Sequence, residues 1–547
     1  MTDATVARQV AAALARHGVR RMFGVPGGGS SLDLIEAGAE LGIEFVLART
    51  ESAALMMAAA TAELSGTPGV AITTKGPGTA NGTNGFAYAA IDRAPLVLLT
   101  DGFTPAETAF VTHQVFDQQA LLAPLAKGAG RLEGDDAADE FEALLQLAMT
   151  PPFGPVLVEL TSEAAKRVVR AVTPGARSAR HDAARPGATA TLDVPAVDAA
   201  RSLLAGARRP VMIVGLESRD AATAAAVRRL AGSLACPVLA TYKAMGVMPD
   251  SHPQYVGGFT SGAAEFETVS RADLILLVGF DPVELLRQRW RYSAPVVDVA
   301  AVVHPVHYVE PAAGLYGAIA PVLDALAVGA GPGDWTRDEL ATLKRGMRAA
   351  LRYESHGPGL SPQQVVEIVA EAAAQLPALP RIAVDAGAHM FSAMAFWPSA
   401  EPCDALISNG LATMAFALPA AIASALHHPE RIAIAFTGDG GLFMCLAELS
   451  TAVLAGARVV TIVFNDGALS LIDIKQQQRR LPTRGVRWER PDFAAVMRGL
   501  GGRGYRVDDE VGYRRALTDA FAGEGPALID VVVDPTGYTD QLKALRG

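Results

Sequence analysis

Apolar runs and segments with helical spacing alternate along much of this chain, and residues 431–464 show the pattern most clearly. Residues 431–436 form a short apolar run, which the small residues 437–441 end. Residues 446–454 then repeat apolar positions with helical spacing, and residues 459–464 form a second apolar run. This order predicts a buried strand, a glycine turn, a helix and a second strand parallel to the first.

Two aspartates follow these two predicted strands. Asp439 stands between Gly438 and Gly440, and Asp466 follows Asn465. The carboxyl ends of parallel strands form the ligand-binding edge of an open α/β sheet, and carboxylate oxygens suit a hard divalent cation. The glycines let backbone amides approach an anion at the start of the helix. We therefore expect a metal ion and a diphosphate together.

A third carboxylate follows an apolar run in the N-terminal half. Residues 45–50 read as a buried strand that leads into Glu51, and the Ala-rich residues 52–64 read as a helix. A carboxylate at this junction is expected to be partly desolvated, and burial raises a glutamate pKa toward the range where the group exchanges protons at neutral pH. The alternative is a glutamate favoured only by the dipole of the helix.

The same alternation continues through the rest of the chain. Apolar runs at residues 211–214 and 274–278 alternate with helical segments. The first and last parts of the chain also end alike, with a helix followed by a Gly-Pro-strand segment at residues 154–160 and 525–531. The pattern predicts an α/β protein with three doubly wound parallel-sheet domains, the outer two being related repeats.

Two loop-forming stretches divide the chain. Residues 173–195 are rich in Pro, Gly and small polar residues, and residues 329–362 contain two Gly-Pro-Gly segments around one charged helical stretch. The predicted domains are residues 1–172, 191–335 and 361–547, with linkers at residues 173–190 and 336–360.

Composition narrows the possible functions. The net charge of −10 over 547 residues, without a basic face, argues against nucleic-acid binding. The N-terminus reads as an amphipathic helix without a long apolar region, so neither a signal peptide nor a membrane anchor is expected. The three cysteines, Cys236, Cys403 and Cys445, have neither paired nor metal-binding spacing. We expect a cytoplasmic protein.

The spacing between Gly438-Asp439-Gly440 and Asn465-Asp466 resembles the thiamine diphosphate motif of the family that contains acetolactate synthase, benzoylformate decarboxylase and pyruvate oxidase. The motif usually ends in Asn-Asn, whereas this chain has Asn-Asp. The resemblance implies that Asp439, Asp466 and the backbone carbonyl of Ala468 bind Mg²⁺. By itself, a Gly-Asp-Gly segment after a strand is often only a turn.

Other segments resemble the same family in the same order along the chain: residues 23–28, 76–81, 385–389 and 410–419. The resemblance implies that Glu51 sets the tautomer of the aminopyrimidine ring, and that Met414 bends the cofactor; a core methionine is the alternative for Met414. The implied cofactor-binding residues are Gly28, Glu51, Gly76, Asn81, Gly387, His389, Gly410, Met414, Gly438, Asp439, Gly440, Gly441, Asp466, Ala468, Leu469 and Ser470.

Residues near the expected substrate agree less closely with the family. Residues 112–119 resemble a segment on the substrate side of acetolactate synthases, with His113 and Gln114 as catalytic candidates, although an exposed loop is the alternative for His113. Lys127 is similar in spacing to a lysine of catabolic acetolactate synthases. Lys75, the fourth catalytic candidate, stands where most acetolactate synthases have Ser. It either holds a substrate carboxylate or pairs with a nearby acid.

The resemblance implies a carboligase/lyase that needs thiamine diphosphate and Mg²⁺, decarboxylates a small 2-oxo acid and joins the product to an acceptor. A simple decarboxylase similar to benzoylformate decarboxylase is the main alternative. A flavin-dependent oxidase is less favoured, and FAD is not expected, because residues 279–284 lack the arginine pattern of flavin-containing relatives. A non-catalytic subunit is the other alternative; such a subunit is expected to have lost Glu51 or a metal ligand, and this chain has lost neither. The family architecture implies a homodimer or homotetramer with active sites between subunits.

Overall fold

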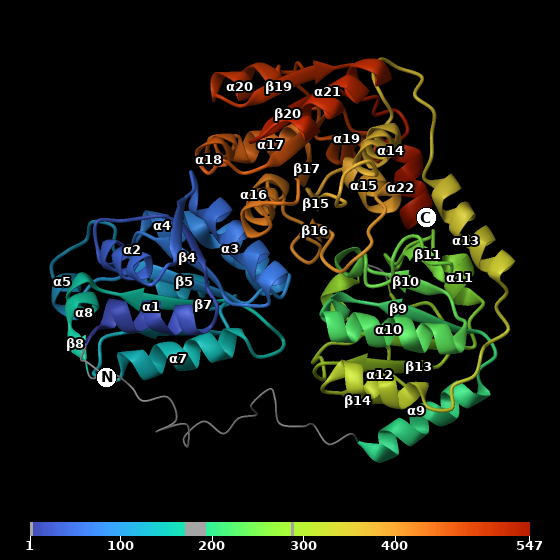
Figure 1. Cartoon of the computed structure of the whole chain (residues 1–547), viewed down its shortest axis with the longest axis horizontal. Coiled ribbons are helices and arrows are strands. Elements are labelled where there is room, and N and C mark those ends of the chain that lie inside the picture. The colour runs from blue at the N-terminus through green and yellow to red at the C-terminus, as the bar shows by residue number, and fades with distance from the viewer. Residues whose placement is uncertain (1–3, 170–192, 286–288) are drawn as a thin grey trace. The chain divides into compact units, whose positions relative to one another are not determined.

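Three six-stranded parallel sheets organise the protein, as seen in a computed structural model that describes residues 4–169, 193–285 and 289–547 (Figure 1). Their parallel pairing and intervening helices confirm the predicted fold class. The described residues fall into two compact units. Residues 418–430 and 445–458 pack with the N-terminal sheet, and the rest of the chain after residue 193 forms the other unit.

The N-terminal sheet has the strand order β3-β2-β4-β5-β7-β6. Helices α1, α2 and α7 share one apolar core with β4, β5 and β7, whereas α3 packs on β2 and β4 and against α4. The elements are β2 (Arg21–Val25), β3 (Glu44–Leu47), β4 (Gly69–Thr73), β5 (Leu96–Asp101), β6 (Gly128–Arg131), β7 (Val156–Leu160), α1 (Val6–Arg16), α2 (Ser30–Glu40), α3 (Glu51–Ser65), α4 (Pro77–Ile91), α6 (Gln118–Leu122), α7 (Ala137–Ala148) and α8 (Ser162–Lys166).

The central sheet has the order β11-β10-β9-β12-β13-β14, the order of dinucleotide-binding sheets. Helices α10 and α12 pack against each other over its core. The elements are β9 (Pro210–Val214), β10 (Val238–Ala240), β11 (Tyr255–Gly258), β12 (Leu274–Val278), β13 (Val296–Ala300), β14 (Ala313–Tyr316), α9 (Val194–Gly206), α10 (Ala221–Leu234), α12 (Ile319–Ala327) and α13 (Arg337–Ala350).

The C-terminal sheet has the order β16-β15-β17-β18-β20-β19. With strands numbered along the chain within each sheet, both outer sheets run 2-1-3-4-6-5, which agrees with the predicted repeat. The elements are β15 (Arg381–Val384), β16 (Ala405–Ile407), β17 (Ala433–Gly438), β18 (Val459–Asn465), β19 (Arg503–Val507), β20 (Ala527–Val532), α14 (Pro362–Ala373), α15 (His389–Phe396), α16 (Ala417–His427), α17 (Asp439–Cys445), α18 (Glu448–Leu454), α19 (Ser470–Gln478), α20 (Phe493–Gly499), α21 (Glu510–Ala522) and α22 (Tyr538–Arg546).

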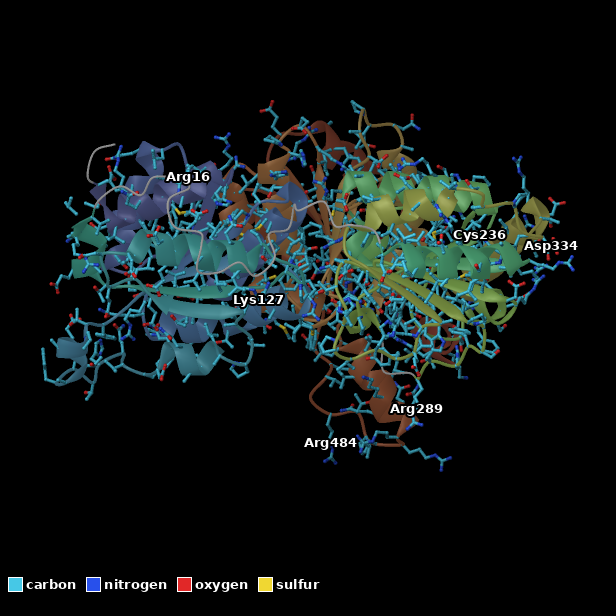
Figure 2. The ribbon with its side chains drawn as sticks, turned by 90° about the horizontal axis from the view of Figure 1, so that it is seen from below. Arg16, Lys127, Cys236, Arg289, Asp334 and Arg484 are labelled. Atoms are coloured by element: carbon cyan, nitrogen blue, oxygen red, sulfur yellow. The ribbon has the colours of Figure 1, made fainter. Side chains whose placement is uncertain are left out.

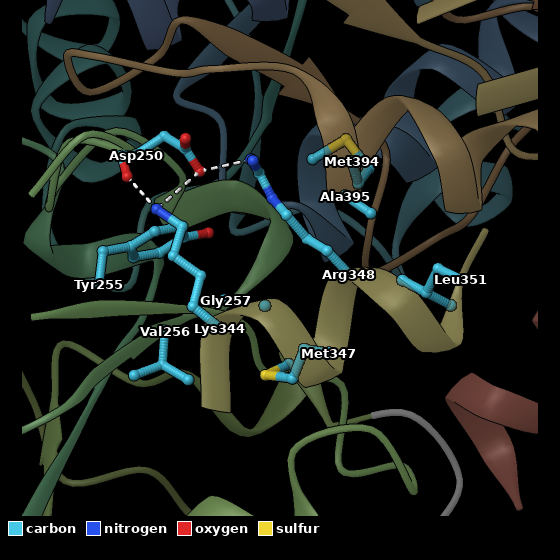
Figure 3. Close-up of a pocket in the computed structure, with 11 residues that line it drawn as sticks. Asp250, Tyr255, Val256, Gly257, Lys344, Met347, Arg348, Leu351, Met394 and Ala395 are labelled. Atoms are coloured by element: carbon cyan, nitrogen blue, oxygen red, sulfur yellow. Dashed lines mark hydrogen bonds and ion pairs between the residues drawn. The ribbon is translucent and has the colours of Figure 1, made fainter. Parts of the chain in front are cut away.

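The region of the second predicted linker contains helix α13. Its Leu340 and Leu343 belong to the core of the central sheet, and Lys344 and Arg348 form ion pairs with Asp250 (Figure 3). Asp250, Lys344 and Arg348 border a cavity of only about 30 Å³. The first predicted linker, residues 173–190, lies outside the described residues, so the domain boundaries remain predictions. No helix in the described ranges is long and apolar enough to span a membrane.

Helix α3 lies close to β4 because both contribute small residues. A Cβ added to Gly69 would lie 2.1 Å from the carbonyl oxygen of Ala58, a contact that neither backbone can relieve without moving. The alanines of α3 between Ala53 and Ala62 are correspondingly buried. This close approach fixes α3, and therefore Glu51 at its first turn, against the sheet.

Gly69→Ala is expected to lower the melting temperature, because overpacking at such a contact costs about 1 to 3 kcal/mol. Gly232→Ala in α10 is the matched control, since a Cβ there meets no atom within 4 Å. In a helix that change is expected to stabilise by about 0.5 to 1 kcal/mol. Calorimetric melting of the two variants checks the prediction, and equal shifts would contradict it.

Candidate active site

The N-terminal sheet presents its predicted site residues at the carboxyl ends of β2, β3 and β4. Gly28 follows β2, and a Cβ added there meets no atom within 4 Å, so its backbone borders open space. The turn is held by buried Asp101 at the end of β5, whose Oδ1 accepts hydrogen bonds from Ser30 Oγ and from Ser31 N and Oγ, each at 2.8 Å. Sequence reasoning did not identify Asp101.

Glu51 is the first residue of α3, and its carboxylate meets the first turn of α4. Asn81 Nδ2 donates to Glu51 Oε2 at 2.5 Å, and a Cβ added to Gly78 would lie 3.4 Å from Glu51 Oε1. The structure therefore brings together Glu51 and Asn81, two residues predicted from separate segments. The Glu51 side chain is partly exposed.

A buried carboxylate outside the N-terminal segment holds the residue before Glu51. Glu448, the first residue of α18, accepts hydrogen bonds from Arg49 N at 3.1 Å and from Thr50 N at 2.9 Å. Burial raises the pKa of Glu448 above its ordinary value, and the hydrogen bonds oppose that shift. Glu448 thus fixes the β3–α3 junction, and sequence reasoning missed it.

The loop after β4 is fixed by Gln118. Its Oε1 accepts from Gly76 N at 3.0 Å and from Thr79 Oγ1 at 2.5 Å, while its Nε2 donates to the Asp101 carbonyl at 3.2 Å. Gln114 packs on this loop in a left-handed conformation, with φ of 63°; a Cβ at Gly76 would lie 2.5 Å from the Gln114 carbonyl oxygen. His113 is exposed.

Lys75 directly precedes this loop. Its Nζ lies 4.1 Å from the centroid of the Phe103 ring, and it forms no ion pair within 4.0 Å with any described residue. It lines a cavity of about 300 Å³ with Gly102, Thr104, Glu107, Thr161, Ser162 and Glu163. Hydrogen bonds from Thr104, and the charge of Lys75, hold the pKa of Glu107 below its ordinary value.

Lys127 lies in a different environment from Lys75. Its Nζ donates to the carbonyl oxygens of Leu147 at 2.7 Å and Thr150 at 2.5 Å, at the C-terminal end of α7. Desolvation, with repulsion from Arg93, lowers the pKa of Lys127 to about 8. These contacts give Lys127 a capping role at the helix end.

In the C-terminal sheet, Asp439 and Asp466 follow the adjacent strands β17 and β18, as predicted. Asp439 is buried, and its Oδ1 accepts from Gly440 N at 2.8 Å while its Oδ2 accepts from Gly467 N at 2.8 Å. Asp466 Oδ1 accepts from Ala468 N at 3.0 Å, and its Oδ2 accepts from Ser470 Oγ at 2.5 Å.

Both carboxyl groups hold protons more tightly than ordinary aspartates. Desolvation and repulsion from Asp466 raise the pKa of Asp439 to about 7, and desolvation raises the pKa of Asp466 to about 6. Desolvation and repulsion between the two groups disfavour their charged forms, and a bound divalent cation would stabilise those forms. The residues present therefore fit a magnesium site.

His389 contacts the turn that precedes Asp439. Its Nδ1 would lie 3.4 Å from a Cβ on Gly438, an ordinary contact, whereas its ring would lie 2.6 Å from a Cβ on Gly387, so position 387 favours glycine. The His389 ring stacks on Phe464. Burial lowers the pKa of His389 to about 4, so the ring is neutral near pH 7. Its Nε2 has no hydrogen-bond partner in the described part of the chain.

Asp385, at the end of β15, fixes the neighbouring loop. Its Oδ1 accepts from Phe416 N at 2.7 Å and Ala417 N at 2.8 Å, and its Oδ2 accepts from Thr437 Oγ1 at 2.7 Å. A Cβ on Gly441 would lie 2.3 Å from Asp385 Oδ2, so the third residue of α17 must be glycine.

Apolar side chains gather over Gly440. A Cβ added there would lie 2.7 Å from Leu469 Cδ2, 3.3 Å from Trp488 and 3.6 Å from Met414 Cε. The structure thus brings Met414 and Leu469 to the motif turn, as the resemblance implies. Gly410 lies earlier in the Met414 loop, which turns sharply at Ala412 and Ala415, both with positive φ. Trp488 was not predicted.

The ligand-binding crevice of the central sheet is crossed by the chain's own groups. Gly215 and Gly279 approach so closely that a Cβ on Gly215 would lie 2.5 Å from the Gly279 carbonyl oxygen. Buried Glu284 accepts from Leu216 N at 2.9 Å and from Thr241 Oγ1 at 2.5 Å. Burial raises the pKa of Glu284 to about 8, and its hydrogen bonds hold these loops together.

Comparisons with known proteins agree with this geometry. The N-terminal thiamine pyrophosphate-binding domain of the thiamine pyrophosphate enzymes matches residues 4–121, their central domain matches residues 197–326, and their C-terminal thiamine pyrophosphate-binding domain matches residues 385–531. The chain therefore belongs to the thiamine pyrophosphate (thiamine diphosphate) enzymes.

Relatives refine this assignment. The chain is 28% identical to an acetolactate synthase of Bacillus subtilis, over 97% of this chain and 92% of that protein. It is also 28% identical to a catabolic acetolactate synthase of Raoultella terrigena, over 95% and 93%. A probable 2-ketoarginine decarboxylase of Pseudomonas aeruginosa is 29% identical over 95% and 92%. The protein is a thiamine diphosphate-dependent enzyme of the acetolactate synthase type.

Mg²⁺ binding in the presence of thiamine diphosphate is expected to tighten as pH rises from about 5 to about 8, because the cation must displace protons from Asp439 and Asp466. Each displaced proton changes the affinity up to about tenfold per pH unit. The pKa values of both aspartates are higher in the folded protein than in the unfolded chain. The metal-free protein is therefore expected to lose stability as the pH rises from about 4 to about 7.

Calorimetric titration in two buffers with different ionisation enthalpies measures this proton release, and melting of the metal-free protein across the same pH range measures the stability. Binding without proton release would contradict the prediction.

Proposed function

We propose that this enzyme decarboxylates a small 2-oxo acid and joins the resulting acyl unit to an acceptor, with Mg²⁺ as the second cofactor. The observation that carries the proposal is the pair formed by buried Asp439 and half-buried Asp466 at adjacent strand ends, whose raised pKa values favour binding of a cation. The near full-length similarity to two acetolactate synthases supports the carboligation step.

Asp439, Asp466 and the backbone carbonyl of Ala468 would hold Mg²⁺ on the diphosphate. Thiamine diphosphate, when bound, supplies an electron sink for the electrons that decarboxylation leaves on the acyl carbon. The chain's own residues bind, orient and exchange protons. Met414 and Leu469 offer apolar contacts beside the turn, and neutral His389 offers a ring nitrogen without adding charge.

Glu51 is proposed to exchange the proton that sets the cofactor tautomer. Its carboxylate, at the first turn of α3, accepts a hydrogen bond from Asn81 of α4, and Glu448 binds the backbone of the preceding residue, Thr50. These contacts restrict where the carboxylate points, which a positioned general acid–base requires. His113 and Gln114 remain candidates for contact with the substrate, because both are exposed on the loop beside Gly76.

The functional assembly is proposed to be a homodimer or homotetramer with active sites between subunits, located in the cytoplasm. The proposed assembly rests on the architecture of the resembled family, and the proposed location rests on the three free cysteines.

Simple decarboxylation is the second candidate. Lys75 lines a cavity beside the Gly76 loop, where most acetolactate synthases have a small serine, and one relative is a probable 2-ketoarginine decarboxylase. We propose that Lys75 binds a carboxylate or another acidic group of the substrate. Glu107 and Glu163 in the same cavity add negative charge, which favours a substrate that also carries a hydrogen-bond donor.

With thiamine diphosphate and Mg²⁺, the purified enzyme is expected to release CO₂ from at least one 2-oxo acid of a broad panel. A 2-hydroxy ketone product supports carboligation, and an aldehyde supports simple decarboxylation. Glu51→Gln is the matched variant: it is expected to keep calorimetric cofactor binding but to slow proton–deuterium exchange at the cofactor C2 by about 10²- to 10⁴-fold. Unimpaired exchange would assign the proton transfer to another group.

Lys75→Ser is expected to lower kcat/KM for the best substrate about ten- to a hundredfold, mainly through KM, because a charge-assisted contact is worth about 1.5 to 3 kcal/mol. The ratio of kcat/KM for dicarboxylic 2-oxo acids to kcat/KM for simple 2-oxo acids should move closer to one. Lys75→Arg keeps the charge and is expected to retain more activity. Steady-state kinetics over the panel measure this, and unchanged kinetics would make Lys75 structural and pyruvate the leading substrate.

A further inference from the structure

A short segment after α19 pairs with the loop that carries Asp466. Trp488 N donates to the Gly467 carbonyl at 2.9 Å, and Leu469 N donates to the Val486 carbonyl at 2.8 Å. Ala468 and Arg487 form an antiparallel bridge between these hydrogen bonds. We call residues 486–490 the strap. It lies along the loop that provides the proposed Ala468 ligand.

Two arginines of the strap also bind residues outside it. Arg487 forms an ion pair with Asp473 of α19 at 2.6 Å, and Arg490 NH2 donates to the Val533 carbonyl at 3.4 Å. The preceding residues are exposed, and Figure 2 shows Arg484 at the outer end of that segment. The strap is therefore the fixed end of a longer exposed loop.

Trp488 directs its indole N–H from the strap to Asp439. Trp488 Nε1 donates to Asp439 Oδ2 at 3.1 Å, beside the hydrogen bond from Gly467 N to the same oxygen. Its ring lies against Gly440 and meets Phe443 edge to face, with centroids 6.1 Å apart. The ring thus covers one side of the carboxylate with apolar surface.

An indole suits this place for a chemical reason. It is a donor only, so it cannot compete with the carboxylate for a cation, and it brings no positive charge that would repel one. Donors that bind the ligand carboxylate from outside fix its rotation, and their loss typically weakens metal affinity ten- to a hundredfold.

We propose that Trp488 is a positioning residue for the metal site: its indole N–H fixes the Asp439 carboxylate for Mg²⁺ and fastens the strap to the cofactor-binding loop. The inference rests on the proposed magnesium site. An indole N–H only donates hydrogen bonds, so Trp488 acts through Asp439 and not as a ligand.

Trp488→Phe tests this, because it keeps a ring and removes the N–H. Calorimetry of Mg²⁺ binding with saturating thiamine diphosphate is expected to show affinity weakened ten- to a hundredfold. The turnover rate of this variant at saturating Mg²⁺ is expected to change much less, so the variant should mainly need a higher Mg²⁺ concentration. Trp488→His, which keeps a ring N–H donor, is expected to recover part of the affinity and serves as the second variant if the Phe variant fails to fold.

Trp335→Phe is the matched control. Buried Trp335 also donates its indole N–H, to the Pro210 carbonyl at 2.9 Å, but it lies in the core of the central sheet. The Mg²⁺ affinity of the Trp335→Phe variant is expected to equal that of the wild type. Unchanged affinity in Trp488→Phe, or an equal loss in both Phe variants, would overturn the proposal. A wild-type protein that binds thiamine diphosphate without Mg²⁺ would instead overturn the proposed metal site and this inference with it.

Discussion

The repulsion between two desolvated carboxylates, buried Asp439 and half-buried Asp466, is the constraint on which the proposed metal site depends. Adjacent parallel strands bring the two groups to one edge, where burial and proximity both disfavour their charged forms. The two carboxylates accept hydrogen bonds from neutral donors: backbone amides, a serine hydroxyl and an indole. These donors orient the oxygens without cancelling their charge, and the charge of Arg490 opposes the raised pKa of Asp466 only in part.

The outer sheets use a common device to keep their strand-end turns in place. Buried Asp101 binds the Ser30–Ser31 turn in one sheet, and buried Asp385 binds the Phe416–Ala417 backbone in the other. In both cases a carboxylate that has no ion pair with the described residues accepts several hydrogen bonds from the segment that follows another strand of the same sheet. Such networks are rigid because breaking any one bond leaves a buried acceptor unsatisfied.

Local pattern was sufficient to predict the repeat and strands such as β9, β12, β17 and β18, because period and turn chemistry are properties of neighbouring residues. The predicted buried strand at residues 45–50 is wrong in part: β3 ends at Leu47, and as an edge strand it is largely exposed. The helix predicted over residues 446–454 corresponds to α18, Glu448–Leu454. The structure adds a separate short helix, α17, over Asp439–Cys445, where the sequence pattern predicted only a turn. The contacts of Trp488 with Asp439 and of Glu448 with Thr50 could not be predicted. Their partners are 49 and 398 residues away, and no spacing rule relates them.

The aspartate at position 466, where the resembled family usually has asparagine, changes the physics of the site more than its shape. Asparagine offers the same ligand oxygen without a charge, so only Asp439 would then be coupled to protons. With Asp466, the donor set carries two charges, and its Oδ1 and Oδ2 are already held by Ala468 N and Ser470 Oγ. The metal-free protein bears more repulsion, and metal binding relieves more of it. This substitution therefore ties stability, cation binding and pH together in one pair of side chains.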